Sequence, residues 1–321
     1  MAQVVVTGRI PRAALDALTS AGHQVDAWEE SGPIPRDTLL ERVRGAQAVV
    51  TLVTERVDAE LLDAAGDGLR VVANVAVGYD NVDVAACRER GVVVTNTPGV
   101  LTAATADITM ALVLMVTRRL GEAERLVRSG TPWQWGMEMM LGRGLQGRTL
   151  GIVGLGGIGR ATARRARAFG MEIVYTGRRD APPEVEAELS AQRLPLEELL
   201  TASDVVSLHL PYSARTHHLV GPEQLRLIGP TSYLVNTARG PIVDESALVA
   251  ALEAGEIAGA GLDVHEHEPR VHPGLLGRED VVLLPHVGSA TVETRTAMAT
   301  LAADNVVAVL AGEEPRTPVE G

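Results

Sequence analysis

The first stretch whose residue types and spacing suggest chemistry is the glycine-rich sequence GIVGLGGIG at positions 151–159. Residues 148–153 predict a short buried strand, residues 160–169 predict a helix that Gly170 ends, and residues 171–175 predict another strand. A strand, a glycine turn, a helix and a second strand within about 30 residues form the unit that binds dinucleotides. These flanks favour a dinucleotide site over a fortuitous glycine-rich turn in another α/β fold.

The glycines of this turn have separate physical roles. Gly154 allows a tight turn, Gly156 lets the backbone approach a pyrophosphate, and Gly159 lets the helix pack close to the sheet. The helix N-terminus adds free N–H groups and the positive end of its dipole, which attract phosphates. We therefore expect the turn to hold a cofactor through Gly154, Leu155, Gly156, Gly157, Ile158 and Gly159.

Three later strand ends carry side chains that can bind anions or move protons. Arg239, the segment 263–268 with its acids and histidines, and His286 each directly follow a predicted strand. Ligands of parallel sheets bind outside the carboxyl ends of the strands, so we expect these side chains to serve one site. Taken singly, each has an ordinary alternative, namely a surface arginine, a solvated loop acid and a turn histidine.

The motifs at these strand ends, NTARG at 236–240, DVHEHEP at 263–269 and PHVGS at 285–289, occur in the order seen in a known family. They resemble the D-isomer-specific 2-hydroxyacid dehydrogenases, and within that family the glyoxylate/hydroxypyruvate reductases. The similarity covers essentially the whole chain, including residues 74–81 and 102–107.

The resemblance implies a catalytic role for three residues. Arg239 would be the catalytic arginine, Glu268 rather than Glu266 the catalytic glutamate, and His286 the acid/base histidine. The chemistry of reducing a 2-oxo acid agrees with these roles. A guanidinium offers a planar fork to the substrate carboxylate and carbonyl oxygen. Hydride addition places charge on that oxygen, which an imidazolium can protonate, and a carboxylate beside the ring favours the imidazolium. The resemblance thus implies reduction of glyoxylate to glycolate and of hydroxypyruvate to D-glycerate, with a nicotinamide as hydride donor.

The resemblance also implies substrate contacts from the first part of the chain. We expect the backbone N–H groups of Val77 and Gly78, after a predicted strand, to bind the substrate carboxylate, and Leu52 to shape the substrate pocket. The alternative for the Val77 loop is a plain strand-to-helix turn. Further cofactor contacts are expected from Thr105, Leu210, Pro211, Thr216, Thr237, Ala238, Asp263 and Gly288.

The end of the second strand of the dinucleotide unit bears on the choice of cofactor. An NAD site places Asp or Glu there, whereas this chain has Arg178 and Arg179 and no carboxylate before Asp180. Two guanidinium groups suit a 2′-phosphate, so we expect a preference for NADP(H), with NAD(H) as a possible second cofactor. The alternative is a pair of solvated loop arginines.

Several histidines suggest a metal site, which we do not predict. His265 and His267 form an H-x-H pair with His272 beyond them, but no further ligand set has a recognisable spacing. Members of the resembled family more often have an aromatic or small residue where His265 stands, so its role stays open. His217 and His218 are expected on a loop surface.

Trp133 and Trp135 lie in a segment between the two halves of the predicted fold. In similar reductases a tryptophan-containing loop at this place reaches across a dimer to the partner's active site. The alternative is ordinary dimer packing, and either interpretation predicts a homodimer; which tryptophan would reach the partner stays open.

The composition limits the possible functions. The net charge of −12 argues against general nucleic-acid binding, and the absence of lysine excludes Schiff-base chemistry and a P-loop lysine. Cys87, the single cysteine, is expected to be a buried, inert thiol in a reducing compartment. The longest apolar stretch, about 103–116, contains Asp107 and is too short to span a bilayer. We therefore expect a cytoplasmic protein without membrane contacts.

Alternating strand and helix patterns predict an α/β fold with two doubly wound, Rossmann-like domains and a cleft between them. We assign residues 1–98 and 288–321 to a flavodoxin-like substrate domain and residues 99–287 to an inserted NAD(P)-binding domain. A long apolar helix is expected at 103–120, and hinges at 96–104 and 287–290.

Other functions stay open at this level. One is a broader D-2-hydroxyacid dehydrogenase or another member of the family, which would oxidise phosphoglycerate, a phosphonate or formate. Another is a non-catalytic NAD(P)-sensing binding protein, against which the joint presence of Arg239, Glu268 and His286 argues.

Overall fold

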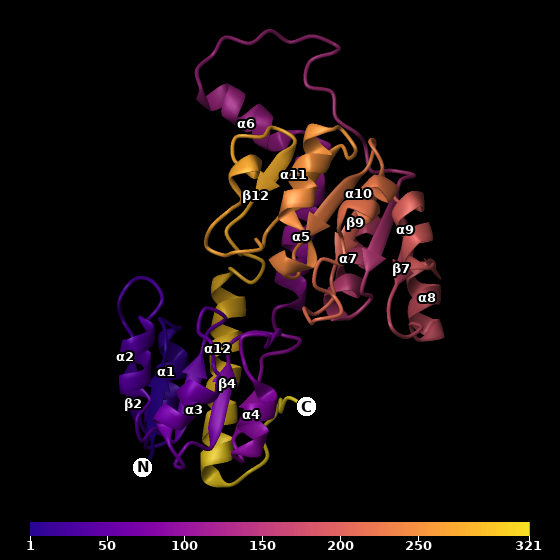
Figure 1. Cartoon of the computed structure of the whole chain (residues 1–321). Coiled ribbons are helices and arrows are strands. Elements are labelled where there is room, and N and C mark those ends of the chain that lie inside the picture. The colour runs from indigo at the N-terminus through magenta and orange to yellow at the C-terminus, as the bar shows by residue number, and fades with distance from the viewer. Residues whose placement is uncertain (321) are drawn as a thin grey trace. The chain divides into compact units, whose positions relative to one another are not determined.

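The computed structural model of the chain describes residues 1–320 and divides into two compact units. Unit 1 contains Met1–Leu101 together with the chain from Ser289 onward, and unit 2 contains Thr102–Gly288. Unit 2 is therefore inserted, in chain order, into unit 1. Figure 1 shows both units as helices around a central sheet, which confirms the expected α/β fold with two doubly wound sheets.

Unit 1 is built on a five-stranded, fully parallel sheet in the order β2-β1-β3-β4-β5, the order of flavodoxin-like sheets. Alternate residues of each strand face two separate cores: Val5 faces α2, α3 and α4, whereas Val4 and Val6 face α1 and α12. The elements are β1 (Gln3–Val6), α1 (Arg12–Ser20), β2 (Gln24–Ala27), α2 (Arg36–Arg42), β3 (Ala48–Thr51), α3 (Ala59–Ala65), β4 (Val71–Asn74), α4 (Val84–Glu89), β5 (Val93–Thr95) and α12 (Val292–Ala311).

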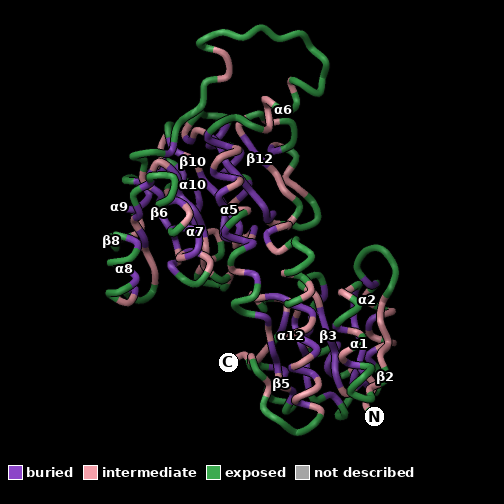
Figure 2. The backbone as a smooth tube through the Cα atoms, turned by 180° about the vertical axis from the view of Figure 1, so that it is seen from behind, coloured by how far each residue is buried: buried purple, intermediate pink, exposed green. Residues whose placement is uncertain are grey.

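Unit 2 is built on a seven-stranded parallel sheet in the order β12-β11-β10-β9-β6-β7-β8. The central strands β6, β9, β10 and β11 are almost entirely buried (Figure 2). Helices α5, α7 and α8 pack on one face of the sheet, and α9, α10 and α11 pack on the other. The elements are α5 (Thr102–Thr117), α6 (Leu120–Arg128), β6 (Thr149–Val153), α7 (Gly157–Ala168), β7 (Glu172–Thr176), α8 (Pro183–Leu189), β8 (Ala191–Arg193), α9 (Leu196–Ala202), β9 (Val205–Leu208), α10 (Pro222–Ile228), β10 (Tyr233–Asn236), the 3-10 turn Gly240–Ile242, α11 (Glu245–Glu253), β11 (Gly259–Leu262), the 3-10 turn Pro273–Leu275 and β12 (Val281–Leu283).

The sequence predicted a helix over residues 103–120, and its predicted C-terminal end is wrong. α5 stops at Thr117 because Arg119 adopts a left-handed conformation (φ 54°), and a separate helix, α6, begins at Leu120. α6 has no buried residue, and together with the loop that follows it extends away from the body of unit 2 (Figure 1). Within residues 1–320 no helix is long and apolar enough to cross a bilayer.

Cys87 lies on α4 among the apolar side chains of unit 1 and is fully buried. Burial, with a smaller contribution from Asp83, raises the pKa of its thiol to about 11. The thiolate is therefore scarce at neutral pH, which agrees with the expected inert role.

Candidate active site

The glycine turn lies where the strand order of unit 2 changes direction. β6 pairs with β7 on one side and with β9 on the other, so the loops after β6 and β9 diverge and leave room for a ligand at the carboxyl edge. Gly154 has a φ of 103°, and a Cβ there would lie 2.8 Å from the carbonyl oxygen of His209. Only glycine fits this turn.

The helix after the turn begins earlier than the sequence pattern indicated, at Gly157 instead of Arg160. A Cβ on Gly159 would lie 2.3 Å from the Gly154 carbonyl oxygen, so the first turn of α7 packs directly on the end of β6. A Cβ on Gly156 would meet no atom within 4 Å, which leaves open space beside the N–H groups of the first helical turn. This open, N–H-lined turn fits a pyrophosphate.

The end of β7 carries two unpaired cations. Arg178 and Arg179 are exposed and form no ion pair with any of residues 1–320. The first carboxylate of the segment, Asp180, lies 2.6 Å from a guanidinium nitrogen of Arg193, which also donates a hydrogen bond to the Gly177 carbonyl. The surface at the end of β7 therefore carries two exposed positive charges beside the Asp180–Arg193 ion pair.

The loop after β9 holds Leu210, Pro211 and Thr216. The Thr216 hydroxyl donates a hydrogen bond to the Pro211 carbonyl (3.0 Å) and accepts one from the Ser213 N–H (2.8 Å), which closes the loop on itself. His209, which we did not single out from the sequence, lies under Gly154 with its Nε2 2.9 Å from Ser207 Oγ. Burial lowers the pKa of His209 to about 4, so it is neutral at physiological pH.

Thr105, Thr237 and Ala238 lie where α5 meets the end of β10. Thr109 Oγ1 lies 2.9 Å from Thr237 Oγ1 and donates to the Thr105 carbonyl, and all three threonines are buried. The Asn236 side chain accepts a hydrogen bond from the Ala238 N–H and donates one to the Arg239 carbonyl. The turn that presents Arg239 is thus held by the last residue of its own strand.

Asp263, which is expected to contact the cofactor, accepts hydrogen bonds from backbone N–H groups. Its two carboxylate oxygens each accept a hydrogen bond of 2.7 Å, from the N–H groups of Val287 and Gly288, and its carbonyl accepts one from the His286 N–H. Burial raises the pKa of Asp263 more than these amides lower it. Asp263 therefore fixes the turn after β12, in which His286 has the strained φ of 54°.

Glu268 and His286 form a pair although they come from different strand ends. Glu268 Oε2 lies 2.9 Å from His286 Nδ1, and Glu268 Oε1 accepts a hydrogen bond from the His265 N–H (3.0 Å). Burial raises the pKa of Glu268, but the His286 side chain and the His265 N–H lower it, and the net shift is downward. The carboxylate is ionised at neutral pH and orients the imidazole, whose Nε2 forms no hydrogen bond within the described part of the chain.

Arg239, Glu268 and His286 thus follow three adjacent parallel strands, β10, β11 and β12, at the edge that also carries the glycine turn. An arginine, an ionised carboxylate and a histidine oriented by it can anchor an anion and pass a proton to an oxygen.

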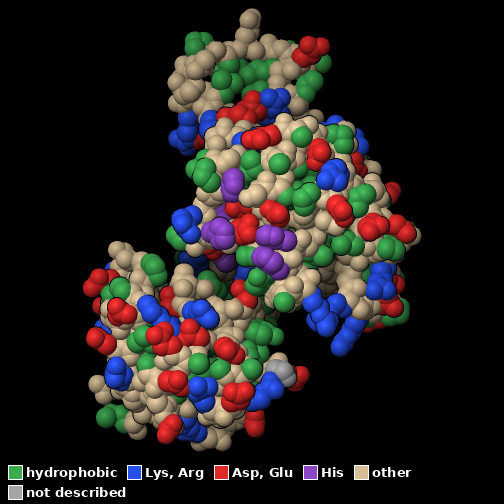
Figure 3. All heavy atoms as spheres, in the orientation of Figure 1, with side chains coloured by type: hydrophobic (Ala, Val, Ile, Leu, Met, Phe, Trp, Pro, Cys, Tyr) green, Lys and Arg blue, Asp and Glu red, His purple; other side chains and the backbone are tan. Residues whose placement is uncertain are grey.

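The other acids and histidines of this edge have different partners. Glu266 binds His218 (2.7 Å) instead of His286, and His218 stacks on His217 at 3.9 Å between ring centres. His272 Nδ1 accepts a hydrogen bond from the Gly274 N–H, and His267 is exposed. Histidines and acids gather on one face of unit 2 (Figure 3), yet no group of three among residues 1–320 is arranged to hold a metal ion.

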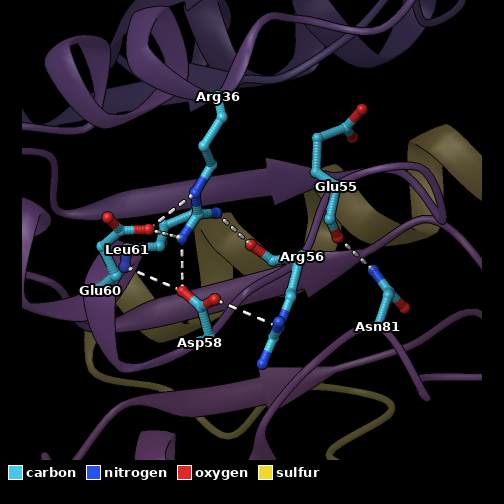
Figure 4. A network of polar contacts seen from close by, with 7 residues as sticks. All are labelled: Arg36, Glu55, Arg56, Asp58, Glu60, Leu61 and Asn81. Atoms are coloured by element: carbon cyan, nitrogen blue, oxygen red, sulfur yellow. Dashed lines mark hydrogen bonds and ion pairs between the residues drawn. The ribbon is translucent and has the colours of Figure 1, made fainter.

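The residues expected to contact the substrate carboxylate lie in unit 1, in two loops that one asparagine joins. Asn81 Nδ2 donates to the carbonyls of Leu52 and Glu55, both at 3.0 Å, and Figure 4 shows its side chain directed at the latter. Asn74 donates to the Gly78 carbonyl, and Asn96 to the Val77 carbonyl. The N–H groups of Val77 and Gly78 donate no hydrogen bond within residues 1–320, so they are available to an anion.

Sequence reasoning missed the residues that hold these loops. Glu55 is buried, and its Oε2 accepts hydrogen bonds from Thr7 Oγ1 (2.6 Å) and the Leu52 N–H (3.1 Å). An acid four residues after a buried strand and the two asparagines at 74 and 81 were the available signals. Beside them, a surface hollow of about 380 Å³ is lined by residues 53–58 and 80–83.

Comparison with known proteins identifies the family of the chain. The family described as D-isomer specific 2-hydroxyacid dehydrogenase, NAD binding domain, matches residues 110–288. The chain belongs to the D-isomer-specific 2-hydroxyacid dehydrogenases. It is 49% identical to a glyoxylate reductase of Thermococcus onnurineus, and the match covers 99% of this chain and 95% of the relative.

Solved structures of related proteins have the same fold. A protein of Thermus thermophilus matches with a TM-score of 0.93 and 47% identity over 99% of this chain and 100% of that one. An NADPH-dependent glyoxylate/hydroxypyruvate reductase of Sinorhizobium meliloti, solved with NADP and malonate, matches with a TM-score of 0.82 and 36% identity over 99% and 96%. As a D-2-hydroxyacid dehydrogenase, the chain is an NAD(P)-dependent oxidoreductase whose family interconverts 2-oxo and 2-hydroxy acids.

Proposed function

We propose that this dehydrogenase is an NADPH-preferring reductase of small 2-oxo acids that converts glyoxylate to glycolate and hydroxypyruvate to D-glycerate. The observation that carries the proposal is the Glu268–His286 pair at the strand edge that also presents Arg239 and the glycine turn. The names of the relatives from Thermococcus and Sinorhizobium support the choice of substrates.

In this proposal the turn at residues 154–159 and the N-terminus of α7 hold the cofactor pyrophosphate, with Thr105, Thr237 and Ala238 along the same edge. A bound nicotinamide supplies the hydride. Asp263 contributes by fixing the 286–288 turn, since both its oxygens are already taken by backbone amides.

His286 is the proposed proton donor. Glu268 accepts a hydrogen bond from Nδ1 and stabilises the imidazolium, so that Nε2 can protonate the substrate oxygen as negative charge develops on it. Arg239 anchors the carboxylate and the carbonyl oxygen of the substrate through its planar guanidinium. The Val77 and Gly78 N–H groups are proposed as further carboxylate donors, and Leu52 as a wall of the pocket. In the oxidative direction His286 acts as the base.

The preference for NADPH rests on the cations at the end of β7. Arg178 and Arg179 are unpaired, and Arg193 neutralises the nearby Asp180. Replacing Arg178 and Arg179 by alanine (R178A/R179A) is expected to raise KM for NADPH about tenfold or more, because charged hydrogen bonds contribute about 1.5–3 kcal/mol each. KM for NADH is expected to change little. R226A, on α10, serves as the control for the loss of a surface arginine. Equal effects on both cofactors would contradict the assignment.

The exposed apolar arm formed by α6 and the loop to residue 144 supports a homodimer. Val127, Trp133, Trp135, Met137 and Leu141 are all more than half exposed, an unusual concentration for a monomeric surface. We propose that a second copy of the chain covers them. We also propose a cytoplasmic location, which the single, buried cysteine supports.

The test of the proposed function is a substrate profile. Purified protein is assayed for NADPH and NADH oxidation with glyoxylate, hydroxypyruvate, pyruvate and bulkier 2-oxo acids. The proposal predicts the highest kcat/KM for NADPH with glyoxylate or hydroxypyruvate. Preference for a bulky oxo acid would instead indicate a broader D-2-hydroxyacid dehydrogenase, and no turnover of any would refute the enzymatic role.

A further inference from the structure

His265 is a buried histidine that the mechanism does not use. Its side chain is 5% exposed, and its Nε2 lies 3.0 Å from the Leu284 carbonyl oxygen. A carbonyl oxygen only accepts, so Nε2 must carry a proton. Nδ1 faces Glu245 Oε1 at 3.7 Å, beyond hydrogen-bond distance, and has no hydrogen-bond partner within the described residues.

Glu245 is as buried as His265 and begins α11. Its Oε1 accepts a hydrogen bond from the Glu266 N–H (2.9 Å), and its own N–H donates to Glu266 Oε2 (3.2 Å). A buried carboxylate is costly unless a positive group compensates its charge, and the facing imidazole is the group placed to do so. The geometry therefore favours a doubly protonated, cationic His265.

His265 contacts all three strand ends that carry the proposed catalytic residues. Its N–H donates to Glu268 Oε1, and its ring holds the Leu284 carbonyl, two residues before His286. A Cβ on Gly240 would lie 1.9 Å from the His265 carbonyl carbon and oxygen, so the backbone that follows Arg239 rests directly on His265. A shift of His265 would move Arg239, Glu268 and His286 together.

We propose that the buried Glu245–His265 ion pair is a positioning element that sets the geometry and the electrostatics of the Glu268–His286 pair. The kinetic part of this inference rests on the proposed reductase function; its structural part does not. His265 touches no reacting atom and acts through Glu268 and the Leu284 carbonyl.

The charged neighbours support the sign of the electrostatic effect. His265 faces Glu245 and Glu268, and Glu245 faces His265 and, farther away, His272. Glu268 faces His286, His265 and Asp263, and Asp263 also faces His286. Glu266 is bound to His218. Burial lowers the pKa of His265, but Glu245 and the Leu284 carbonyl raise it, with a net upward shift. A cationic His265 helps to keep Glu268 ionised, and its removal takes away part of the downward shift in the pKa of Glu268.

The test compares H265F with the double variant E245Q/H265F. The single variant leaves a buried carboxylate unpaired and is expected to be unstable, whereas the glutamine side chain of the double variant keeps an acceptor for the Glu266 N–H without a charge. We expect the double variant to fold, to lose about tenfold in kcat with glyoxylate and NADPH, and to keep both KM values within about twofold. The acid limb of its kcat profile is expected to move to higher pH. H217F, an aromatic replacement of a histidine on a surface loop, is the matched control.

A second readout needs no activity. In protein labelled with ¹⁵N-histidine, the wild-type ring resonances that are absent from E245Q/H265F and present in H286N are expected to show both ring nitrogens protonated at neutral pH. The His286 ring resonances, identified by their loss in H286N, are expected to shift in E245Q/H265F and to stay in place in H217F. A folded double variant with unchanged kcat, pH profile and His286 resonances would overturn the proposal. If the wild type reduces no 2-oxo acid, the proposed function is refuted. The His265 and His286 resonances then test the positioning role of the Glu245–His265 pair by themselves.

Discussion

At the scale of single residues, Glu266 and Glu268 bind different histidines although they are two positions apart. Glu268 reaches His286, and Glu266 reaches His218. The difference arises from the path of the loop after β11, which the His265 N–H fixes by binding Glu268 Oε1. The Glu268–His286 pair therefore depends on the path of the loop as much as on the two side chains.

Replacing Glu268 by glutamine is the sharpest test of this pair. The glutamine side chain can still accept a hydrogen bond from the imidazole, but it lacks the charge that stabilises the imidazolium. We expect kcat for reduction to fall about 10²-fold, because no charge stabilises the imidazolium, and the acid limb that protonation of the Glu268 carboxylate produces to disappear from its pH profile. A pH series of kcat for E268Q, with E223Q on the surface of α10 as control, checks this. An unchanged pH profile would mean that Glu268 does not act on His286.

Single residues also show how far the sequence predicts the site. The three strand-end motifs predicted Arg239, Glu268 and His286, which the structure places on adjacent strands. The sequence did not predict that His265 is buried, because its partners Glu245 and Leu284 lie on α11 and after β12. Likewise, the sequence did not predict that Asp263 accepts hydrogen bonds from the 287 and 288 amides, because these amides lie in the turn after another strand, β12.

At the scale of elements, the apolar runs predicted most strands because a parallel sheet buries both faces of each strand. The sequence pattern did not predict β8 or α6. Neither element has a fully buried residue, so neither shows a clear apolar pattern. The start of α7 at Gly157 was also missed, because glycine has a low helix propensity and the packing of Gly159 on Gly154 overrides it.

The N-terminus of α3 makes a prediction about stability. Asp58 caps this helix by accepting a hydrogen bond from the Leu61 N–H (3.2 Å), and it is paired with Arg36 (Figure 4). Removing the cap in D58A is expected to lower the free energy of unfolding by about 1 kcal/mol, whereas D58N, which keeps a capping oxygen, should lose less. Urea unfolding of both variants measures this; equal losses would show that the charge, and not the cap, matters.

The same carboxylate has a defined pH dependence. Burial raises the pKa of Asp58, but the Leu61 N–H and Arg36 lower it, with a net downward shift. Its contribution to stability is therefore complete above the unfolded-state pKa of about 4 and is lost as the pH falls through the lower folded-state value. The stability difference between wild type and D58N should shrink below about pH 4.

At the scale of the whole molecule, the chain forms two doubly wound units, and one is inserted into the sequence of the other. In the proposed mechanism the glycine turn and the three strand-end residues come from the inserted unit, and the Val77 and Gly78 amides come from the outer unit. Catalysis by this dehydrogenase is thus proposed to need both units, although each has its own sheet and cores.

The exposed arm of unit 2 predicts the state of association. Replacing Trp133 and Trp135 by serine removes two large apolar side chains that are 54% and 74% exposed. If a second copy covers them, the variant is expected to dissociate at concentrations at which the wild type is dimeric, because aromatic anchors dominate such interfaces. Sedimentation equilibrium measures this. A monomeric wild type would refute the proposed homodimer.

His286 is proposed to donate the proton in an NADPH-dependent reduction of glyoxylate or hydroxypyruvate. The most direct measurement is kcat of wild type and H286N with NADPH and each substrate, together with NADPH affinity by fluorescence titration. We predict rapid turnover by the wild type, a loss of about 10²–10⁴-fold in kcat for H286N, and unchanged NADPH binding. Equal kcat values for the two proteins would contradict the account.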